Sequence, residues 1–166
     1  AIDAGIFVVA AAGNDGGAGD DGFVSAPGNV NFVITVGASD RNGDVWSQSS
    51  MGESLDSDGN PRVYPHQKPE LTAPGVNILS TGENNQWYTS SGTSDATVFV
   101  AGALALILEA YPDLKPKPDS TTACIELVKQ ALADSMNTNL QHDTTQGYGQ
   151  LNAKAWLNQF TGSINC

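Results

Sequence analysis

The chain has 166 residues, about the length of one domain, and 40% of them are hydrophobic, which is enough for one packed core. Its 18 acidic and 7 basic residues give a formal net charge of -11 at pH 7. This charge would repel nucleic acid and anionic membrane surfaces, so neither is expected as a partner. The longest apolar run, residues 98–108, is too short to cross a bilayer.

The first residues read as the second half of a strand–helix–strand unit. Residues 1–5 resemble the last turn of a helix closed by Gly5. Residues 6–11 form a short apolar run, typical of a strand buried on both faces of a parallel sheet. The strand that would precede this helix is therefore expected upstream of Ala1, and the chain is expected to be a fragment or a processed product.

The next segments alternate between surface loops and short strands. Residues 13–28 are rich in Gly, Asp, Ser and Pro and leave the carboxyl end of a strand, where open α/β sheets place their ligands. Residues 32–38 predict a second buried strand, and 46–50 a short polar one. Residues 53–67 read as a polar insertion, and 68–75 as a proline-bounded loop.

The second half of the chain is predicted to be mostly helical. A strand at 77–81 and a hairpin arm at 86–90 lead into an apolar helix through 98–108. A helix over 119–134 and a last amphipathic helix over 151–160 follow. The pattern indicates an α/β fold with a parallel sheet flanked by helices. The apolar face of the 119–134 helix comprises Cys124, Leu127, Val128, Ala131 and Leu132.

A hydroxyl-rich turn, residues 90–97, opens the apolar helix. The helix is apolar almost all round, so we expect it to be buried and its start to be fixed by the core. Unpaired N–H groups and the helix dipole favour negative charge at such a start. Ser94 could therefore be a nucleophile whose oxyanion is stabilised there. The alternative is that Thr93 or Ser94 only caps the helix.

Three segments together resemble the subtilisin-like serine proteases. Ala10-Ala11-Ala12-Gly13-Asn14 is similar to the segment that supplies the oxyanion-hole asparagine and one wall of the specificity pocket. Lys68-Pro69-Glu70-Leu71-Thr72-Ala73-Pro74-Gly75 is similar to the family's Lys-Pro-acid loop, and Gly92-Thr93-Ser94 with Ala96-Thr97 to the nucleophile segment. The resemblance covers residues 1–157 and implies that residues 1–166 are the C-terminal part of a subtilisin-like catalytic domain.

The resemblance implies a serine endopeptidase acting on peptides or proteins. Ser94 would be the nucleophile, and the Ser94 N–H and the Asn14 amide would be oxyanion donors. An apolar pocket for the residue whose carbonyl is attacked would be walled by Ala11, Ala12 and Gly13 with the loop near Ser25. For Asn14, the alternative is an asparagine that caps its own turn.

The catalytic base and its orienting carboxylate are not found by motif. In this family both precede the oxyanion asparagine, so an upstream Asp/His segment is expected as a partner. His66 and His142 carry no family motif, and both are expected to be solvated. Asp95 stands where the family has methionine, next to a forming oxyanion, and this departure favours the alternative of a non-catalytic peptide-binding or scaffold module.

Two weaker patterns remain. Asp56, Asp58 and Asn60 have the oxygen-ligand spacing of a partial calcium loop, although a solvated turn explains them as well. Cys124 and Cys166 make an even cysteine count and can form one disulfide that ties down the C-terminal tail; the alternative is one buried thiol in the helix and one cysteine in a frayed C-terminal end. With the family resemblance, this count predicts a secreted protein, extracellular or periplasmic.

Overall fold

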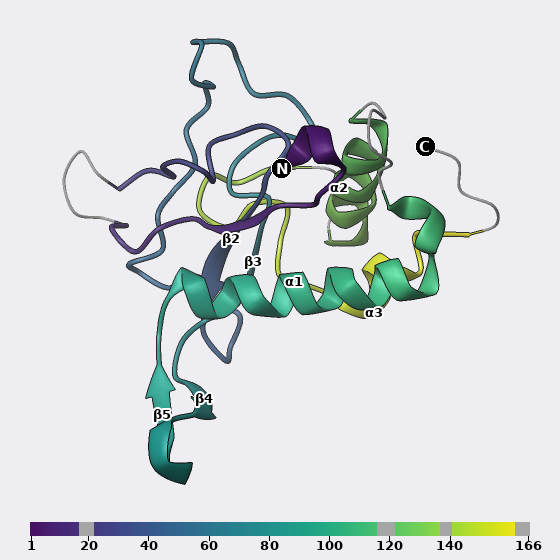
Figure 1. The fold of residues 1–166 in the computed structure, drawn as a ribbon. Coiled ribbons are helices and arrows are strands. Elements are labelled where there is room, and N and C mark those ends of the chain that lie inside the picture. The colour runs from purple at the N-terminus through teal and green to yellow at the C-terminus, as the bar shows by residue number, and fades with distance from the viewer. Residues whose placement is uncertain (17–21, 116–121, 137–140, 162–166) are drawn as a thin grey trace.

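A three-stranded parallel sheet lies at the centre of the computed structural model, which describes residues 1–16, 22–115, 122–136 and 141–161. The strands are β1 (Val9–Ala11), β2 (Ile34–Ser39) and β3 (Leu71–Pro74), in the order β1-β2-β3 (Figure 1). All six residues of β2 are buried, as its run of apolar and β-branched residues predicts. Val9 pairs with Ile34, and Val36 with Leu71.

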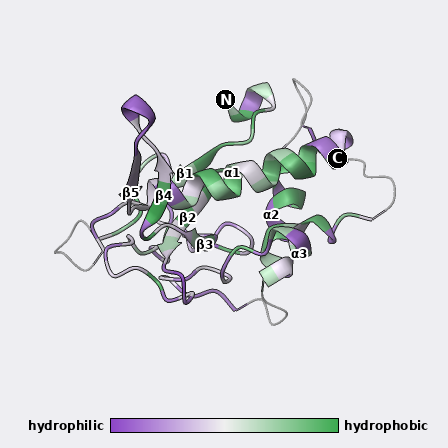
Figure 2. Cartoon of the chain, turned by 90° about the horizontal axis from the view of Figure 1, so that it is seen from below, coloured by the Kyte–Doolittle hydropathy of each residue, from purple (hydrophilic) through white to green (hydrophobic). Residues whose placement is uncertain are grey.

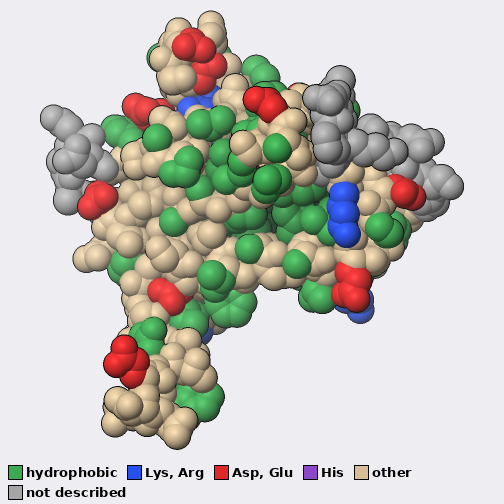
Figure 3. Space-filling model, viewed as in Figure 1, with side chains coloured by type: hydrophobic (Ala, Val, Ile, Leu, Met, Phe, Trp, Pro, Cys, Tyr) green, Lys and Arg blue, Asp and Glu red, His purple; other side chains and the backbone are tan. Residues whose placement is uncertain are grey.

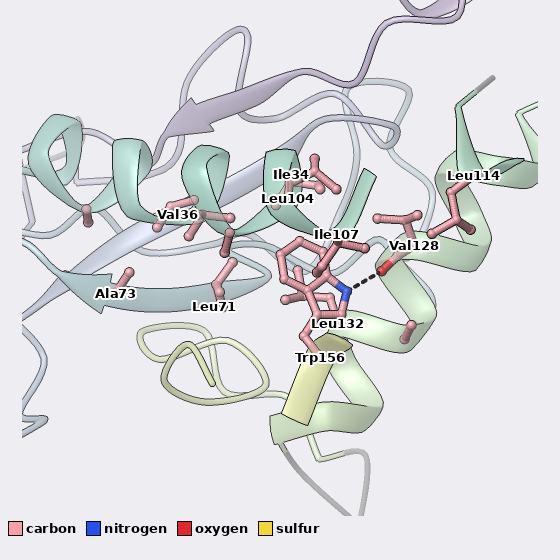
Figure 4. Close-up of a cluster of buried hydrophobic side chains, with 14 of the residues drawn as sticks. Ile34, Val36, Leu71, Ala73, Leu104, Ile107, Leu114, Val128, Leu132 and Trp156 are labelled. Carbon is pink, nitrogen blue, oxygen red and sulfur yellow. Dashed lines mark hydrogen bonds between the residues drawn. The ribbon is translucent and has the colours of Figure 1, made fainter. Parts of the chain in front are cut away.

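Helix α1 (Thr93–Ala110) contacts all three strands, and α2 (Ala123–Met136) and α3 (Ala153–Leu157) close the core at its far end (Figure 1). Figure 4 shows Trp156 of α3 between these helices, with its indole N–H donating to the Val128 carbonyl at 3.2 Å. The remaining helical turns are η1 (Ile2–Ala4), η3 (Glu83–Asn85) and η4 (Pro112–Leu114).

A two-stranded antiparallel hairpin projects from the body beside the start of α1 (Figure 1). Its strands are β4 (Ile78–Thr81) and β5 (Trp87–Ser90), close to the ranges expected from the sequence. Trp87 and Tyr88 are exposed on β5. Because β5 ends at Ser90, the hairpin leads directly into the turn before Ser94.

Helix α1 is buried on one side only, so the prediction that it is enclosed all round is wrong for the described structure. Val100, Leu104 and Ile107 face the sheet and are buried, whereas Val98, Phe99 and Leu106 are 65%, 42% and 67% exposed. Figure 2 shows that α1 is hydrophobic over most of its length. Figure 3 shows hydrophobic side chains at the molecular surface on the side of α1 that faces away from the sheet.

By length and composition α1 could cross a membrane. Its packing on the sheet is that of the core helix of an α/β domain. Its exposed apolar side chains, which we call the α1 outer face (Val98, Phe99 and Leu106), mark a surface suited to protein contact.

Two short segments differ from the sequence expectation. Residues 46–50 form turns instead of a strand, and only Val45 bridges to Ser39. The proline-bounded segment 68–75 contains strand β3, whose last residue is Pro74. A proline is tolerated there because it ends an outer strand of the described sheet, where no ladder hydrogen bond is lost.

Three charged side chains are buried together beside the sheet, each at 1% exposure: Lys68, Glu70 and Lys129. Glu70 Oε1 lies 2.8 Å from Lys68 Nζ and 2.5 Å from Lys129 Nζ. Burial would raise the pKa of Glu70, but the two ammonium groups outweigh it and hold this pKa below its usual value. Burial lowers the pKa of Lys68 to about 7.

The structure describes only one of the two cysteines of the expected disulfide. Cys124 is buried in α2 and is not a free thiol. Cys166 lies outside the described residues, so its pairing with Cys124 stays a prediction.

Candidate functional site

Asn14 follows the end of β1 and is held against the start of α1 by Thr93. The Asn14 Oδ1 atom accepts hydrogen bonds from the Thr93 backbone N–H and from Thr93 Oγ1, both at 2.9 Å. Because a backbone N–H can only donate, the atom that faces it must be the amide oxygen. The Asn14 NH₂ group is therefore directed away from Thr93, and Asn14 itself is exposed.

Ser94 is the second residue of α1 and is exposed. Its backbone N–H makes no hydrogen bond to any of the residues that the structure describes, as expected in the first turn of a helix. Its neighbour Thr93 carries the bonds to Asn14, so the Ser94 hydroxyl, the Ser94 N–H and the Asn14 amide lie at one helix start. The Ser94 N–H points out at the positive end of the helix dipole, and the role of the Asn14 amide as a second donor to an oxyanion stays a prediction.

The loop that carries Asn14 is fixed by Gly13 and Ser50. Gly13 has φ +115°, and a Cβ there would lie 2.7 Å from Ser50 Oγ, so a side chain is excluded. Ser50 N–H donates to the Gly13 carbonyl at 2.9 Å, and Gly13 N–H donates to Thr93 Oγ1 at 3.2 Å. Ser50 and Thr93 thus position the loop that carries Asn14, a role that the sequence did not reveal. Thr93 was noticed only as part of the segment that resembles the nucleophile region.

The residues expected to wall a pocket lie on two adjacent segments. Ala11 ends β1, and Ala12 is 1% exposed, so at Ala12 the backbone and not the methyl group can face a ligand. Ser25 is exposed in a turn closed by a hydrogen bond from the Asn29 N–H to its carbonyl.

These two segments meet at residues 50–51. Gly13 pairs with Ser50, while Gly22 and Val24 exchange hydrogen bonds with Met51. The Ala11–Gly13 segment and the segment leading to Ser25 therefore flank the same strip of chain. Their role in binding a substrate stays a prediction.

Asp95 lies on the hairpin side of the helix start. Its Oδ1 atom accepts a hydrogen bond of 2.5 Å from Ser90 Oγ at the end of β5. A Cβ built on Gly92 would lie 3.5 Å from Asp95 Oδ2 and 3.5 Å from Asn14 Nδ2, so these two groups approach the same point. The carboxylate that replaces the family's methionine is held by Ser90, yet it borders the space beside Ser94.

Neither histidine is solvated as expected, and each is engaged away from Ser94. His66 Nδ1 lies 2.8 Å from the Asn31 carbonyl and 3.1 Å from Lys129 Nζ. Burial and the Lys129 charge lower the pKa of His66. His142 Nε2 lies 2.8 Å from the Pro69 carbonyl, and its ring packs edge-on to Tyr148. Burial also lowers the pKa of His142.

The segment expected to bind calcium forms a closed turn. Asp56 Oδ1 accepts hydrogen bonds from the backbone N–H groups of Asp58 and Asn60, at 3.0 and 2.9 Å. The bond from Asn60, with that from Asp58, lowers the pKa of Asp56 although burial opposes the shift. Within the described parts of the chain, no three His, Cys, Asp or Glu side chains converge as metal ligands. The fit to calcium is therefore partial, with two carboxylates and one amide.

Thermal unfolding tests the calcium prediction. If Asp56, Asp58 and Asn60 bind the ion, millimolar calcium should raise Tm by about 2–4 °C, because a ligand bound only by the folded state stabilises it. The response should vanish in Asp58→Ala and persist in Asp44→Ala, which removes an exposed carboxylate from another turn. An unchanged Tm in the parent chain would leave the solvated turn as the explanation.

An exposed serine and an asparagine amide lie at one helix start, on a parallel sheet flanked by helices. The family model described as the subtilase family (peptidase S8) matches residues 1–149. The chain therefore belongs to the subtilase family.

Individual relatives agree with this assignment. The chain is 43% identical over 127 residues to serine protease AprX of Bacillus subtilis, covering 68% of this chain and 28% of the relative. It is 38% identical over 151 residues to subtilisin DY of Bacillus licheniformis, covering 91% of this chain and 46% of the relative. The chain thus spans less than half the length of these two relatives.

Solved structures show the same fold. The prenylagaramide maturation protease PagA superposes with a TM-score of 0.68 at 30% identity, covering 95% of this chain and 52% of that one. The self-cleaved protease domain of PatA superposes with a TM-score of 0.65 at 26% identity, covering 93% of this chain and 49% of that one. The subtilisin-like α/β fold predicted from the sequence is confirmed.

Proposed function

We propose that the chain is the C-terminal part of a subtilisin-like catalytic domain, and that the complete domain is a serine endopeptidase acting through an acyl-enzyme at Ser94. One observation carries the proposal: Ser94 is exposed at the start of α1 beside an Asn14 amide whose oxygen is fixed by Thr93. Two relatives described as a serine protease and a subtilisin support it.

In the proposed reaction, Ser94 Oγ attacks the carbonyl carbon of the scissile peptide bond. The oxygen that becomes negative accepts hydrogen bonds from the Ser94 N–H and the Asn14 NH₂ group. A histidine, oriented by an aspartate, takes the serine proton and passes it to the leaving amine. His66 and His142 are engaged elsewhere in the fold, so we assign this pair to an upstream Asp/His segment of the same domain.

The α1 outer face is the surface that we assign to that segment. Val98, Phe99 and Leu106 are exposed, and β1 lies at the edge of the described sheet. An apolar helix face beside an unpaired strand edge is stabilised by further strands and helices packed on it. The chain also covers less than half the length of the two subtilases compared above, which leaves room for such a segment.

The substrate would be a peptide or protein, with the residue on the acyl side next to Ala11, Ala12, Gly13 and Ser25. The net charge of -11 disfavours nucleic acid and anionic membranes as partners. The even cysteine count, with Cys124 not free, supports a secreted protein in the extracellular or periplasmic space.

Labelling with a fluorophosphonate tests the function. The chain alone should label weakly, since no base activates Ser94, and adding the upstream segment, in trans or as one chain, should restore labelling. Ser94→Ala should abolish it, whereas Ser91→Ala, which removes a nearby exposed hydroxyl, should retain it.

Two outcomes would contradict the proposal. Strong labelling of the isolated chain would mean that a base lies within it. Absence of labelling in the complete protein would favour the alternative, a non-catalytic peptide-binding or scaffold module. The observation that favours this alternative is the Asp95 carboxylate, which borders the space beside Ser94.

A further inference from the structure

The first three residues of α1 face three different surroundings. Successive residues of a helix are rotated by about 100°, so Thr93 and Asp95 leave the helix in different directions, although Asn14 Nδ2 and Asp95 Oδ2 both approach one point beside Gly92. Thr93 Oγ1 donates to Asn14 at 2.9 Å, on the side of β1. Asp95 Oδ1 accepts from Ser90 at 2.5 Å, on the side of β5. Ser94, between them, is exposed.

A substrate chain that crosses Ser94 therefore meets different chemistry on its two sides. One side is the segment Ala11–Asn14, which carries small side chains and the amide donor. The other side is the end of the projecting hairpin, where Ser90 and Asp95 form a polar, acidic pair (Figure 1). Asp95 is half-buried, so its carboxylate is both partly shielded and accessible.

The direction of the substrate follows from the proposed function, on which this inference rests. The proposed function places the residue that becomes the acyl group next to Ala11, Ala12, Gly13 and Ser25. The leaving amine and the residue attached to it then lie on the opposite side, next to Ser90 and Asp95.

We propose that Asp95, positioned by Ser90, selects substrates with a lysine or arginine as the first residue of the leaving group. Asp95 makes no ion pair with a described Lys, Arg or His, so its charge is not neutralised by the described part of this chain. Ser90 Oγ donates a hydrogen bond to Oδ1 of Asp95. The other carboxylate oxygen, Asp95 Oδ2, lies near Gly92, beside the site of attack. A cationic side chain there gains a favourable interaction, and an acidic one meets repulsion.

The selectivity is measured on the complete protein with internally quenched peptides that share one acyl half. Their first leaving-group residue is Lys, Arg, Gln or Glu. We expect kcat/KM for Lys or Arg to exceed that for Gln by about five- to tenfold at low salt, with Glu lowest, and we expect the ratio to shrink as ionic strength rises.

Two variants test whether the selectivity is local. Asp95→Asn should bring the Lys/Gln ratio close to one. Glu83→Gln removes the same charge from the exposed tip of the hairpin and should leave the ratio unchanged. Ser90→Ala should reduce the ratio only in part, because the carboxylate remains but loses its fixed orientation. An equal ratio for all four peptides, or a ratio that survives in Asp95→Asn, would overturn the proposal.

A binding experiment separates this inference from the proposed function. The Ser94→Ala protein is titrated by calorimetry with short peptides that begin with Lys or Gln, as the leaving product would. Tighter binding of the Lys peptide, lost in Asp95→Asn, supports the subsite even if no peptide is cleaved, in which case the proposed function fails alone. Cleavage without any preference at this residue would retain the function and reject the subsite.

Discussion

Asn14→Ala in the complete domain should lower kcat by about 10²–10³ with little change in KM. Loss of one oxyanion-hole donor has this magnitude, which is known from a subtilisin and carried over to this chain. The effect should fall on kcat because the amide bonds to the oxygen strongly only when that oxygen is negative. In the structure the amide oxygen is held by Thr93 at 2.9 Å, which leaves the NH₂ group as the donor.

Steady-state kinetics with one peptide substrate measures this effect, and three further variants define its cause. Asn158→Ala, an exposed asparagine at the end of α3, should be unchanged. Thr93→Val removes the hydroxyl bond but keeps the backbone bond to Asn14, so it should cause a smaller loss. Ser94→Ala should reduce turnover to the background. An Asn14→Ala protein with unchanged kcat would show that Asn14 only caps its own turn.

Much of the fold could be predicted from local sequence. The apolar runs at 6–11 and 32–38 predicted the buried strands β1 and β2, because a strand buried on both faces needs apolar residues throughout. The hairpin and the three helices also followed from periodicity and turn residues. The positions of Ser94 and Asn14 followed from motifs, since each lies directly after a regular element.

Two features of the fold escaped local reasoning because long-range contacts override local patterns. Residues 68–75 contain two prolines and read as a loop, yet Leu71–Pro74 pairs with β2 as strand β3. Lys129 lies on the apolar side of α2 and is 1% exposed, because its partner Glu70 comes from a segment 59 positions earlier in the printed sequence. No local window contains both residues.

The supporting residues of the site were hidden for the same reason. Ser50 contacts Gly13 across 37 positions and Thr93 contacts Asn14 across 79, so their roles appear only in three dimensions. The two histidines read as surface residues, but His66 and His142 accept or donate hydrogen bonds within the fold.

Glu70→Gln should lower the free energy of unfolding by about 3–5 kcal/mol, the usual result of removing one partner from a buried ion pair. Glu70 is the anion between two ammonium groups, 2.8 Å from Lys68 and 2.5 Å from Lys129, and its Oε2 accepts the Thr35 N–H at 2.7 Å. The glutamine keeps the volume but removes the carboxylate that stabilises the charged forms of the two buried lysines. Urea denaturation measures the loss, and Glu53→Gln, an exposed glutamate, should change stability by less than about 0.5 kcal/mol.

The pH dependence of stability gives a second, independent test of this buried cluster. The pKa of Glu70 is lower in the folded chain than its ordinary value of 4.5, so the folded state binds fewer protons than the unfolded state below about that pH. The contribution of Glu70 to stability is therefore present above pH 4.5 and is lost as the pH falls through the folded pKa. The parent chain should lose stability steeply in this acid range, and Glu70→Gln should lack that component.

Adding Lys129→Met to Glu70→Gln should recover part of the loss, because one unpaired cation is removed. A Glu70→Gln chain destabilised by less than 1 kcal/mol, with an unchanged acid profile, would contradict the assignment of Glu70 as the anion that holds these two lysines.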